Sequence, residues 1–133
     1  MKTHTKYLYS LTNTSLTLRV IEHLRDYYQT ELISVTVINL IDRWLVKINL
    51  KDSVEVELVK NLQAFLNELG VPYQPTSAIA IALSELERGE SPVEIMNRYR
   101  VVIVAYGKPE KKEIEIFREQ IVRRLGYCPQ NMA

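Results

Sequence analysis

Cysteine is nearly absent from this sequence, since Cys128 is the only one in 133 residues. A lone cysteine cannot form an internal disulfide bond or a metal site built from several cysteines. A reactive thiol also needs a lowered pKa, and the end of the helix predicted before Cys128 disfavours a thiolate. We therefore expect Cys128 to be an incidental residue near the C-terminus.

Glycine is also scarce, with four residues in the chain. Each is expected to end a helix or turn a strand, at Gly70, Gly89, Gly107 and Gly126. Gly70 in particular stands where a left-handed residue would end a helix. Phosphate-binding loops need several glycines close together, so the sequence excludes the common dinucleotide and P-loop sites.

Histidine is rare, and neither His4 nor His23 has metal-binding spacing or a nucleophile placed beside it. We expect His23 to be a solvated residue on the polar side of a helix. The grouped carboxylates, including Glu85 and Glu87, are expected on helix surfaces rather than in a cleft. The sequence thus predicts no catalytic residue, no metal site and no cofactor.

The net charge is small, at +1 from 17 basic and 16 acidic residues. Proteins dedicated to nucleic-acid binding usually carry a clear basic excess, so this balance argues against that class. The sequence has no apolar run approaching the roughly 18 residues of a membrane helix. The first residues also lack the pattern of a signal peptide. We expect a cytoplasmic protein without membrane association.

The residues that are present indicate an ordinary globular domain. Apolar residues make up 47% of the chain and charged residues 25%. The length also fits one domain. We predict a single α/β domain over residues 1–133, with loose tails at 1–5 and 127–133.

Strand patterns occur in four segments, residues 6–11, 32–40, 43–50 and 100–106. In the third segment, strict alternation places Trp44, Val46 and Ile48 on one face. The second and third segments are expected to form a hairpin or to meet at a bend. The fourth is a continuous apolar run, which is typical of a central strand covered on both faces.

Helical spacing of apolar residues predicts five helices, beginning near residues 15, 53, 77, 92 and 110. The second follows a capping-box pattern from Asp52 to Glu55. Thr76 or Ser77 is expected to cap the third, and Pro92 stands at the first position of the fourth.

The predicted elements follow the order β-α-β-β-α-α-α-β-α. This order resembles the start of a ferredoxin-like sheet (βαββαβ) with helices packed on it. We predict this α/β (α+β) fold class, with a thioredoxin-like arrangement as the alternative. The order of elements along the chain does not fix the order of strands in the sheet.

Residues 86–99 resemble the helix-turn-helix of small antitoxin domains, through the segment Gly89-Glu90-Ser91-Pro92-Val93-Glu94-Ile95 and the later Tyr99. This resemblance covers about a tenth of the chain. It implies a DNA-binding regulator that uses residues 84–100, with Arg98 and Arg100 near the DNA. The hydrophobic strand predicted after Tyr99 departs from that pattern, so the chain is not assigned to the family.

The junction between the last predicted strand and the last predicted helix is a candidate ligand site. Its residues are Gly107, Lys108, Lys111 and Lys112. Free N–H groups at a helix start bind anions, and ligands of α/β proteins often lie at the carboxyl ends of strands. This pattern favours a sensor of a small anionic ligand.

Tyrosine is the abundant aromatic residue, with eight against two phenylalanines and one tryptophan. Tyrosine is enriched at protein interfaces. It also suits the edge of a core, where its hydroxyl stays wet. The candidate interface residues are Tyr7, Tyr9, Tyr27, Tyr28, Tyr73 and Tyr99.

Together, these patterns favour a small non-enzymatic regulatory or adaptor protein that binds a protein partner and forms a homodimer. The DNA-binding regulator and the anionic-ligand sensor are the two alternatives.

Overall fold

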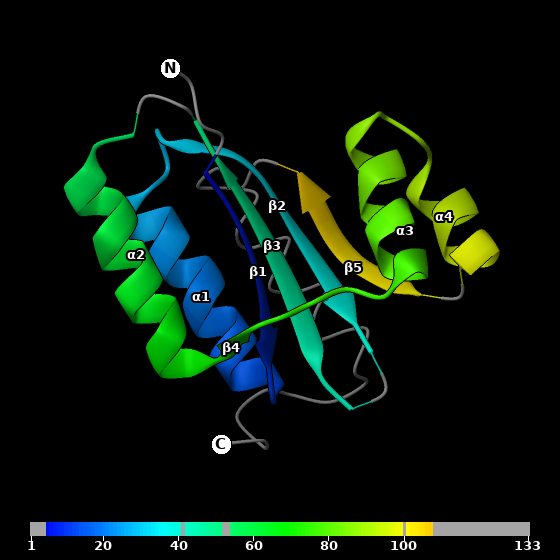
Figure 1. Ribbon diagram of the computed structural model, residues 1–133, viewed down its shortest axis with the longest axis horizontal. Coiled ribbons are helices and arrows are strands. Elements are labelled where there is room, and N and C mark those ends of the chain that lie inside the picture. Colours follow the sequence, from blue (N-terminus) through cyan, green and yellow to red (C-terminus); the bar gives the residue numbers. More distant parts are fainter. Residues whose placement is uncertain (1–4, 41, 52–53, 100, 108–133) are drawn as a thin grey trace.

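The computed structural model describes residues 5–40, 42–51, 54–99 and 101–107, which form one five-stranded sheet and four helices (Figure 1). The strands are β1 (Thr5–Leu11), β2 (Leu32–Asn39), β3 (Trp44–Leu50), β4 (Val71–Pro72) and β5 (Val102–Gly107). The helices are α1 (Thr14–Tyr27), α2 (Val56–Leu69), α3 (Ser77–Glu87) and α4 (Pro92–Tyr99). The fold is therefore mixed α+β.

The strand order in the sheet is β4-β1-β3-β2-β5, and every described pair is antiparallel. Strands β2 and β3 form a hairpin, which is one of the two arrangements expected from the sequence. At its turn, the Leu40 N–H donates to the Arg43 carbonyl oxygen at 2.8 Å. Parallel pairs, which a thioredoxin-like sheet contains, do not occur among the described strands.

The predicted central position of residues 100–106 was wrong. In the described part of the sheet, β5 pairs with β2 alone and lies at the edge. Its first two residues nevertheless contact apolar clusters on opposite faces of the sheet. Val102 contacts the core under α1 and α2, whereas Ile103 contacts the cluster formed with α3 and α4.

The larger core lies between the sheet and the pair α1 and α2, which run side by side in Figure 1. The alternation in β3 sends Trp44, Val46 and Ile48 into this core, as predicted, and all three are buried. Leu45 points to the opposite face and joins a smaller cluster with Ile79 and other residues of α3 and α4. Burial of each such side chain stabilises the fold by about 1.5–3 kcal/mol.

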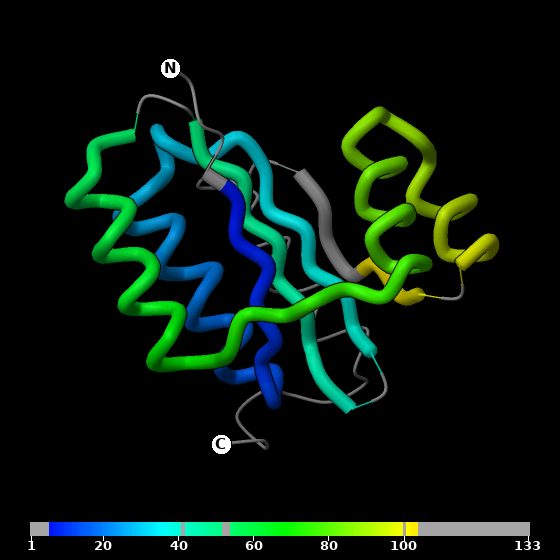
Figure 2. Tube along the Cα trace, viewed as in Figure 1, coloured from blue at the N-terminus to red at the C-terminus, as the bar shows by residue number. Residues whose placement is uncertain are grey.

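The connector after α2 contains a short strand that the sequence did not predict. Val71 and Pro72 pair with Ser10 and Tyr9 of β1. Proline has no N–H to donate, so it is tolerated in a strand at the sheet edge. Figure 2 shows the chain passing from the end of α2 through this segment to α3 on the other side of the molecule.

The starts of α1, α3 and α4 agree with the sequence, and the start of α2 does not. The Thr76 side chain accepts the Ile79 N–H at 3.3 Å, and α4 begins at Pro92. Helix α2 begins at Val56, and its N-cap residue Glu55 makes no side-chain capping bond. The predicted capping box therefore does not cap α2 through Glu55, and Asp52 lies outside the described residues.

Gly70 follows α2 but does not adopt the predicted left-handed conformation. Its φ of −156° is extended backbone. Gly89, between α3 and α4, has the left-handed φ of 96°.

The predicted helix after Pro109 and the predicted tail at 127–133 lie outside the described residues, whereas Thr5 belongs to β1 rather than to a tail. None of the described helices combines the length and hydropathy needed to cross a membrane.

Candidate functional site

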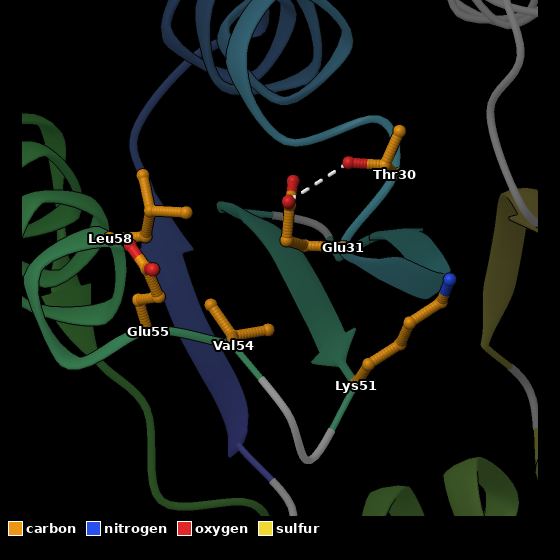
Figure 3. Close-up of a pocket in the computed structure, with 6 residues that line it drawn as sticks. All are labelled: Thr30, Glu31, Lys51, Val54, Glu55 and Leu58. Atoms are coloured by element: carbon orange, nitrogen blue, oxygen red, sulfur yellow. Dashed lines mark hydrogen bonds between the residues drawn. The ribbon is translucent and has the colours of Figure 1, made fainter.

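A pocket of about 410 Å³ opens at the end of the molecule where α1 leads into β2 and β3 leads into α2 (Figure 3). The lining residues are Thr30, Glu31, Lys51, Val54, Glu55 and Leu58. Backbone bonds hold the turn beside it, because the Leu32 N–H donates to the Tyr28 carbonyl oxygen at 3.1 Å. The Lys51 N–H donates to the Glu31 carbonyl oxygen at 2.8 Å. We call this region the pocket end of the molecule.

The pocket combines negative charge with apolar surface. Glu31 and Glu55 are its two carboxylates, and the Thr30 hydroxyl donates to Glu31 Oε2 at 2.9 Å. In Figure 3, the Lys51 side chain points away from both carboxylates. Val54 and Leu58 supply aliphatic surface to the wall. Such a wall suits a ligand group that is itself part apolar and part charged.

Exposed apolar side chains lie at the same end. Tyr27 ends α1 and Val56 begins α2, and each is 66% exposed. Ile33, at the register shift near the start of β2, is 44% exposed. Each of the three lies within three residues along the chain of a residue that lines the pocket.

Three of the predicted interface tyrosines hold α2 against the rest of the fold. Tyr28 donates to the Leu58 carbonyl oxygen at 2.8 Å, and Tyr7 donates to the Val59 carbonyl oxygen at 3.3 Å. Tyr9 donates to Asn67 Oδ1. Burial raises the pKa of all three phenols. Tyr9 and Tyr28 are buried in the chain itself, which leaves Tyr27 as the exposed tyrosine of the pocket end.

The other two predicted interface tyrosines belong to the cluster around α3 and α4. Tyr73 is half-buried against this cluster, and the Arg43 guanidinium lies 5.9 Å from the centre of its ring. Tyr99 donates to Glu85 Oε2 at 2.9 Å, which ties the end of α4 to α3. Both residues therefore have contacts within the fold.

Helices α3 and α4 occupy the segment that resembles a helix-turn-helix. Carboxylates surround its arginine, because Arg98 lies 2.7 Å from Glu85 and 3.9 Å from both Glu90 and Glu94. These carboxylates reduce the positive potential that a phosphate would meet. Arg100 lies outside the described residues, so the DNA-binding alternative stays a prediction.

Glu87 contacts the sheet rather than lying free on the helix surface as predicted. Its carboxylate is 2.6 Å from Lys47 Nζ and 3.7 Å from Lys6 Nζ. Asn49 Nδ2 donates both to Glu87 at 3.1 Å and to Ser34 Oγ at 2.9 Å. Burial raises the pKa of Glu87, but the bonds from Lys47 and Asn49 outweigh it and hold that pKa below its ordinary value.

His23 is not the solvated residue that the sequence predicts. Its ring stacks on Phe65 of α2, with centroids 3.7 Å apart and an interplanar angle of 11°. Tyr27 lies one turn further along α1, with its ring centroid 4.8 Å from that of His23. Burial lowers the pKa of His23 against the opposing charge of Asp26. These contacts give His23 a packing role between α1 and α2.

The predicted anion site lies mostly outside the described residues. Gly107 ends β5, while Lys108, Lys111 and Lys112 are not described. Within the described ranges, no three histidine, cysteine, aspartate or glutamate side chains converge as a metal site would require.

Comparison with known proteins gives a structural match. No protein-family model matches the chain, and no curated protein matches it. Among solved structures, one similar chain is the crystal structure of the C-terminal domain of YpbH, with a TM-score of 0.51 and 14% sequence identity. The match covers 88% of this chain and 99% of that domain. The two share a fold. At this identity, the likeness to the YpbH domain shows the arrangement of elements and nothing about activity.

Proposed function

We propose that this chain is a small non-enzymatic regulatory or adaptor protein, which binds another protein at the pocket end and forms a homodimer. The observation that supports this most is the grouping of Tyr27, Ile33 and Val56 at one end, beside a pocket with carboxylate walls. Protein interfaces have apolar centres in which aromatic residues are enriched. A pocket next to them can receive an anchoring side chain of the partner.

The charged clusters elsewhere support a binding function rather than a reaction at those positions. Glu85 and Arg98 join α3 to α4, and Glu87 and Lys47 join α3 to the sheet. A general acid or base needs a carboxylate that a substrate can approach. These carboxylates are held instead by cations of the fold.

The homodimer part of the proposal draws on a second set of exposed apolar residues. Ile81 of α3 is 48% exposed and Val93 of α4 is 60% exposed. A two-fold dimer brings the same patch of both copies together, so a pair of helices with exposed aliphatic residues suits it.

The finer description of the fold is also part of the proposal. We describe β4-β1-β3-β2 with α1 and α2 as a ferredoxin-like unit to which β5 adds a further strand. The antiparallel neighbours of β1 and β3 support this description, although β4 contributes two residues.

The expected cytoplasmic location also remains a proposal, which fractionation of cells expressing the chain would test.

Site-specific photo-crosslinking in the cells of origin tests the partner. A benzoylphenylalanine at position 56 is compared with one at Gln63, which is exposed further along the same helix. We expect a covalent adduct of defined mass from position 56 and none from position 63. The same adducts from both positions, or none from position 56, would contradict the proposed surface.

A further inference from the structure

We propose that the pocket receives a positively charged side chain, a lysine or an arginine, from the protein that binds at the pocket end. This inference rests on the proposed function and specifies the chemistry of the partner's anchor. It follows from the shape of the pocket, the placement of its charges and the character of the surface around it.

The pocket has room for a long side chain and a lining that suits it. Its volume of about 410 Å³ lies near the lower limit of small-ligand pockets, which span roughly 300–1,000 Å³. Val54 and Leu58 provide aliphatic wall, while Glu31 and Glu55 provide carboxylates. A lysine or arginine side chain has the matching composition, because its methylene stem packs on apolar surface while its head stays charged.

The charges favour a cation over an anion. The Thr30 hydroxyl bonds to Oε2 of Glu31, and no bond to Oε1 occurs among the described residues. Lys51 makes no ion pair with Glu31 or Glu55 in that part of the chain, and Figure 3 shows it directed away from them. The first turn of α2 already contains the acidic residue Glu57, which offsets the positive end of the helix dipole. Two of the three charged side chains that line the pocket are carboxylates, so the balance of charge favours a cation over an anion.

The effect of Glu31 on its neighbour agrees with a negative pocket. Burial raises the pKa of Tyr28, and the charge of Glu31 adds to that increase. The Tyr28 hydroxyl also bonds to the Leu58 carbonyl oxygen, so the wall at Leu58 is fixed in place. A fixed wall reduces the ordering cost when a side chain enters.

The surroundings indicate what flanks the basic residue. Tyr27, Ile33 and Val56 are exposed at the same end, so apolar residues of the partner have surface to bind near the anchor. Interface energy concentrates in such central anchors, while neighbouring apolar contacts exclude water. The partner segment therefore contains a lysine or arginine with apolar residues next to it.

The test is an NMR titration of the full chain labelled with ¹⁵N. The probe is N-acetyl-arginine amide, and the comparison probe is N-acetyl-citrulline amide, which has nearly the same shape without the charge. We expect the arginine probe to shift the amide signals of Thr30, Glu31 and Leu58, and the citrulline probe to bind several-fold more weakly. A third probe, N-acetyl-glutamate amide, should leave these signals unchanged.

Two variants assign the effect to the pocket. Glu31→Gln and Glu55→Gln should each raise the dissociation constant of the arginine probe about three- to fivefold, which is the upper range for an exposed ion pair. The matched control is Glu57→Gln, which makes the same charge change in the first turn of α2 without lining the pocket. Amide spectra of all three variants report whether the fold is kept.

The inference is overturned if citrulline binds as tightly as arginine, if the glutamate probe binds instead, or if the pocket variants match Glu57→Gln. If crosslinking from position 56 persists in that case, a partner binds at this end without a basic anchor, and the proposed function survives. If crosslinking also fails, the proposed function falls with the inference.

Discussion

Gly70 lies so close to Ser10 that a Cβ atom built on Gly70 would stand 2.3 Å from the Ser10 carbonyl oxygen. The same Cβ would also meet Leu11 Cδ2 at 2.7 Å. This approach lets β4 start directly after α2 and pair with β1. Glycine is required here by the space between two backbones, since its φ of −156° is open to any residue.

Replacing Gly70 by asparagine should therefore destabilise the fold by about 1–3 kcal/mol, because β1 must move to admit the side chain. Gly89→Asn is the matched control. Gly89 has a left-handed φ of 96°, which strains any side chain but asparagine less than most, and nothing lies within 4 Å of a Cβ there, so its loss of stability should be smaller. Urea denaturation measures both variants, and equal losses would contradict the steric explanation.

The two glycines illustrate what the sequence can predict. Both stand after a helical pattern, and both were expected to stop a helix. The predicted helix end was correct at both glycines, but its cause differs between them. At Gly70 the cause is the close approach to Ser10, which depends on how β1 and β4 meet in space. Local pattern predicts where an element ends, whereas a close approach between distant segments is a property of the assembled fold.

The Tyr28 hydroxyl bond to the Leu58 carbonyl oxygen gives a second prediction. Tyr28→Phe keeps the buried ring and removes this bond, so we expect a loss of about 0.5–1.5 kcal/mol in the free energy of unfolding. Tyr27→Phe changes the same group on a side chain that is 66% exposed, and its stability should stay within experimental error. Chemical denaturation of the pair provides the measurement, and a stable Tyr28→Phe would show that the bond contributes little.

Glu87 predicts a pH dependence. Its pKa in the folded chain lies below the ordinary value of 4.5, because bonds from Lys47 and Asn49 outweigh the effect of burial. The carboxylate therefore stabilises the fold above that ordinary value, and this contribution is lost as the pH falls through the folded pKa.

Glu87→Gln should consequently lose less stability than the wild type between pH 7 and pH 3. Glu68→Gln, an exposed position of α2, should follow the wild type. Denaturant midpoints at both pH values supply the comparison. If Glu87→Gln loses as much stability between pH 7 and pH 3 as the wild type does, Glu87 contributes nothing to acid sensitivity.

The candidate site was harder to predict than the fold. The sequence predicted two strands that meet here but no register, and the shift between Leu32 and Ser34 that sets Leu32 opposite Leu50 was not predicted. What it could not place is α2, whose start brings Glu55 and Leu58 to the same end. His23 is a similar case, because its spacing to Tyr27 was visible while its stacking on Phe65 depends on how α1 and α2 pack.

Self-association gives a further prediction. Size exclusion with light scattering should show a mass twice that of the 15.5 kDa chain at high concentration. Ile81→Asp places a charge on the proposed two-fold contact and should shift the protein to monomer, whereas Gln63→Asp should not. A monomer at every concentration in the wild type would remove the homodimer from the proposal.

The amide spectrum of the ¹⁵N-labelled chain in a concentrated extract of its own cells shows which surface another protein contacts, whatever that protein is. Binding to a large partner broadens the signals nearest the contact. We expect broadening first at Thr30, Glu31, Ile33 and Val56, a weaker effect in Glu31→Gln and its loss in Val56→Asp. Signals at the pocket end that stay sharp while those of α3 and α4 broaden would contradict the binding surface proposed for this protein.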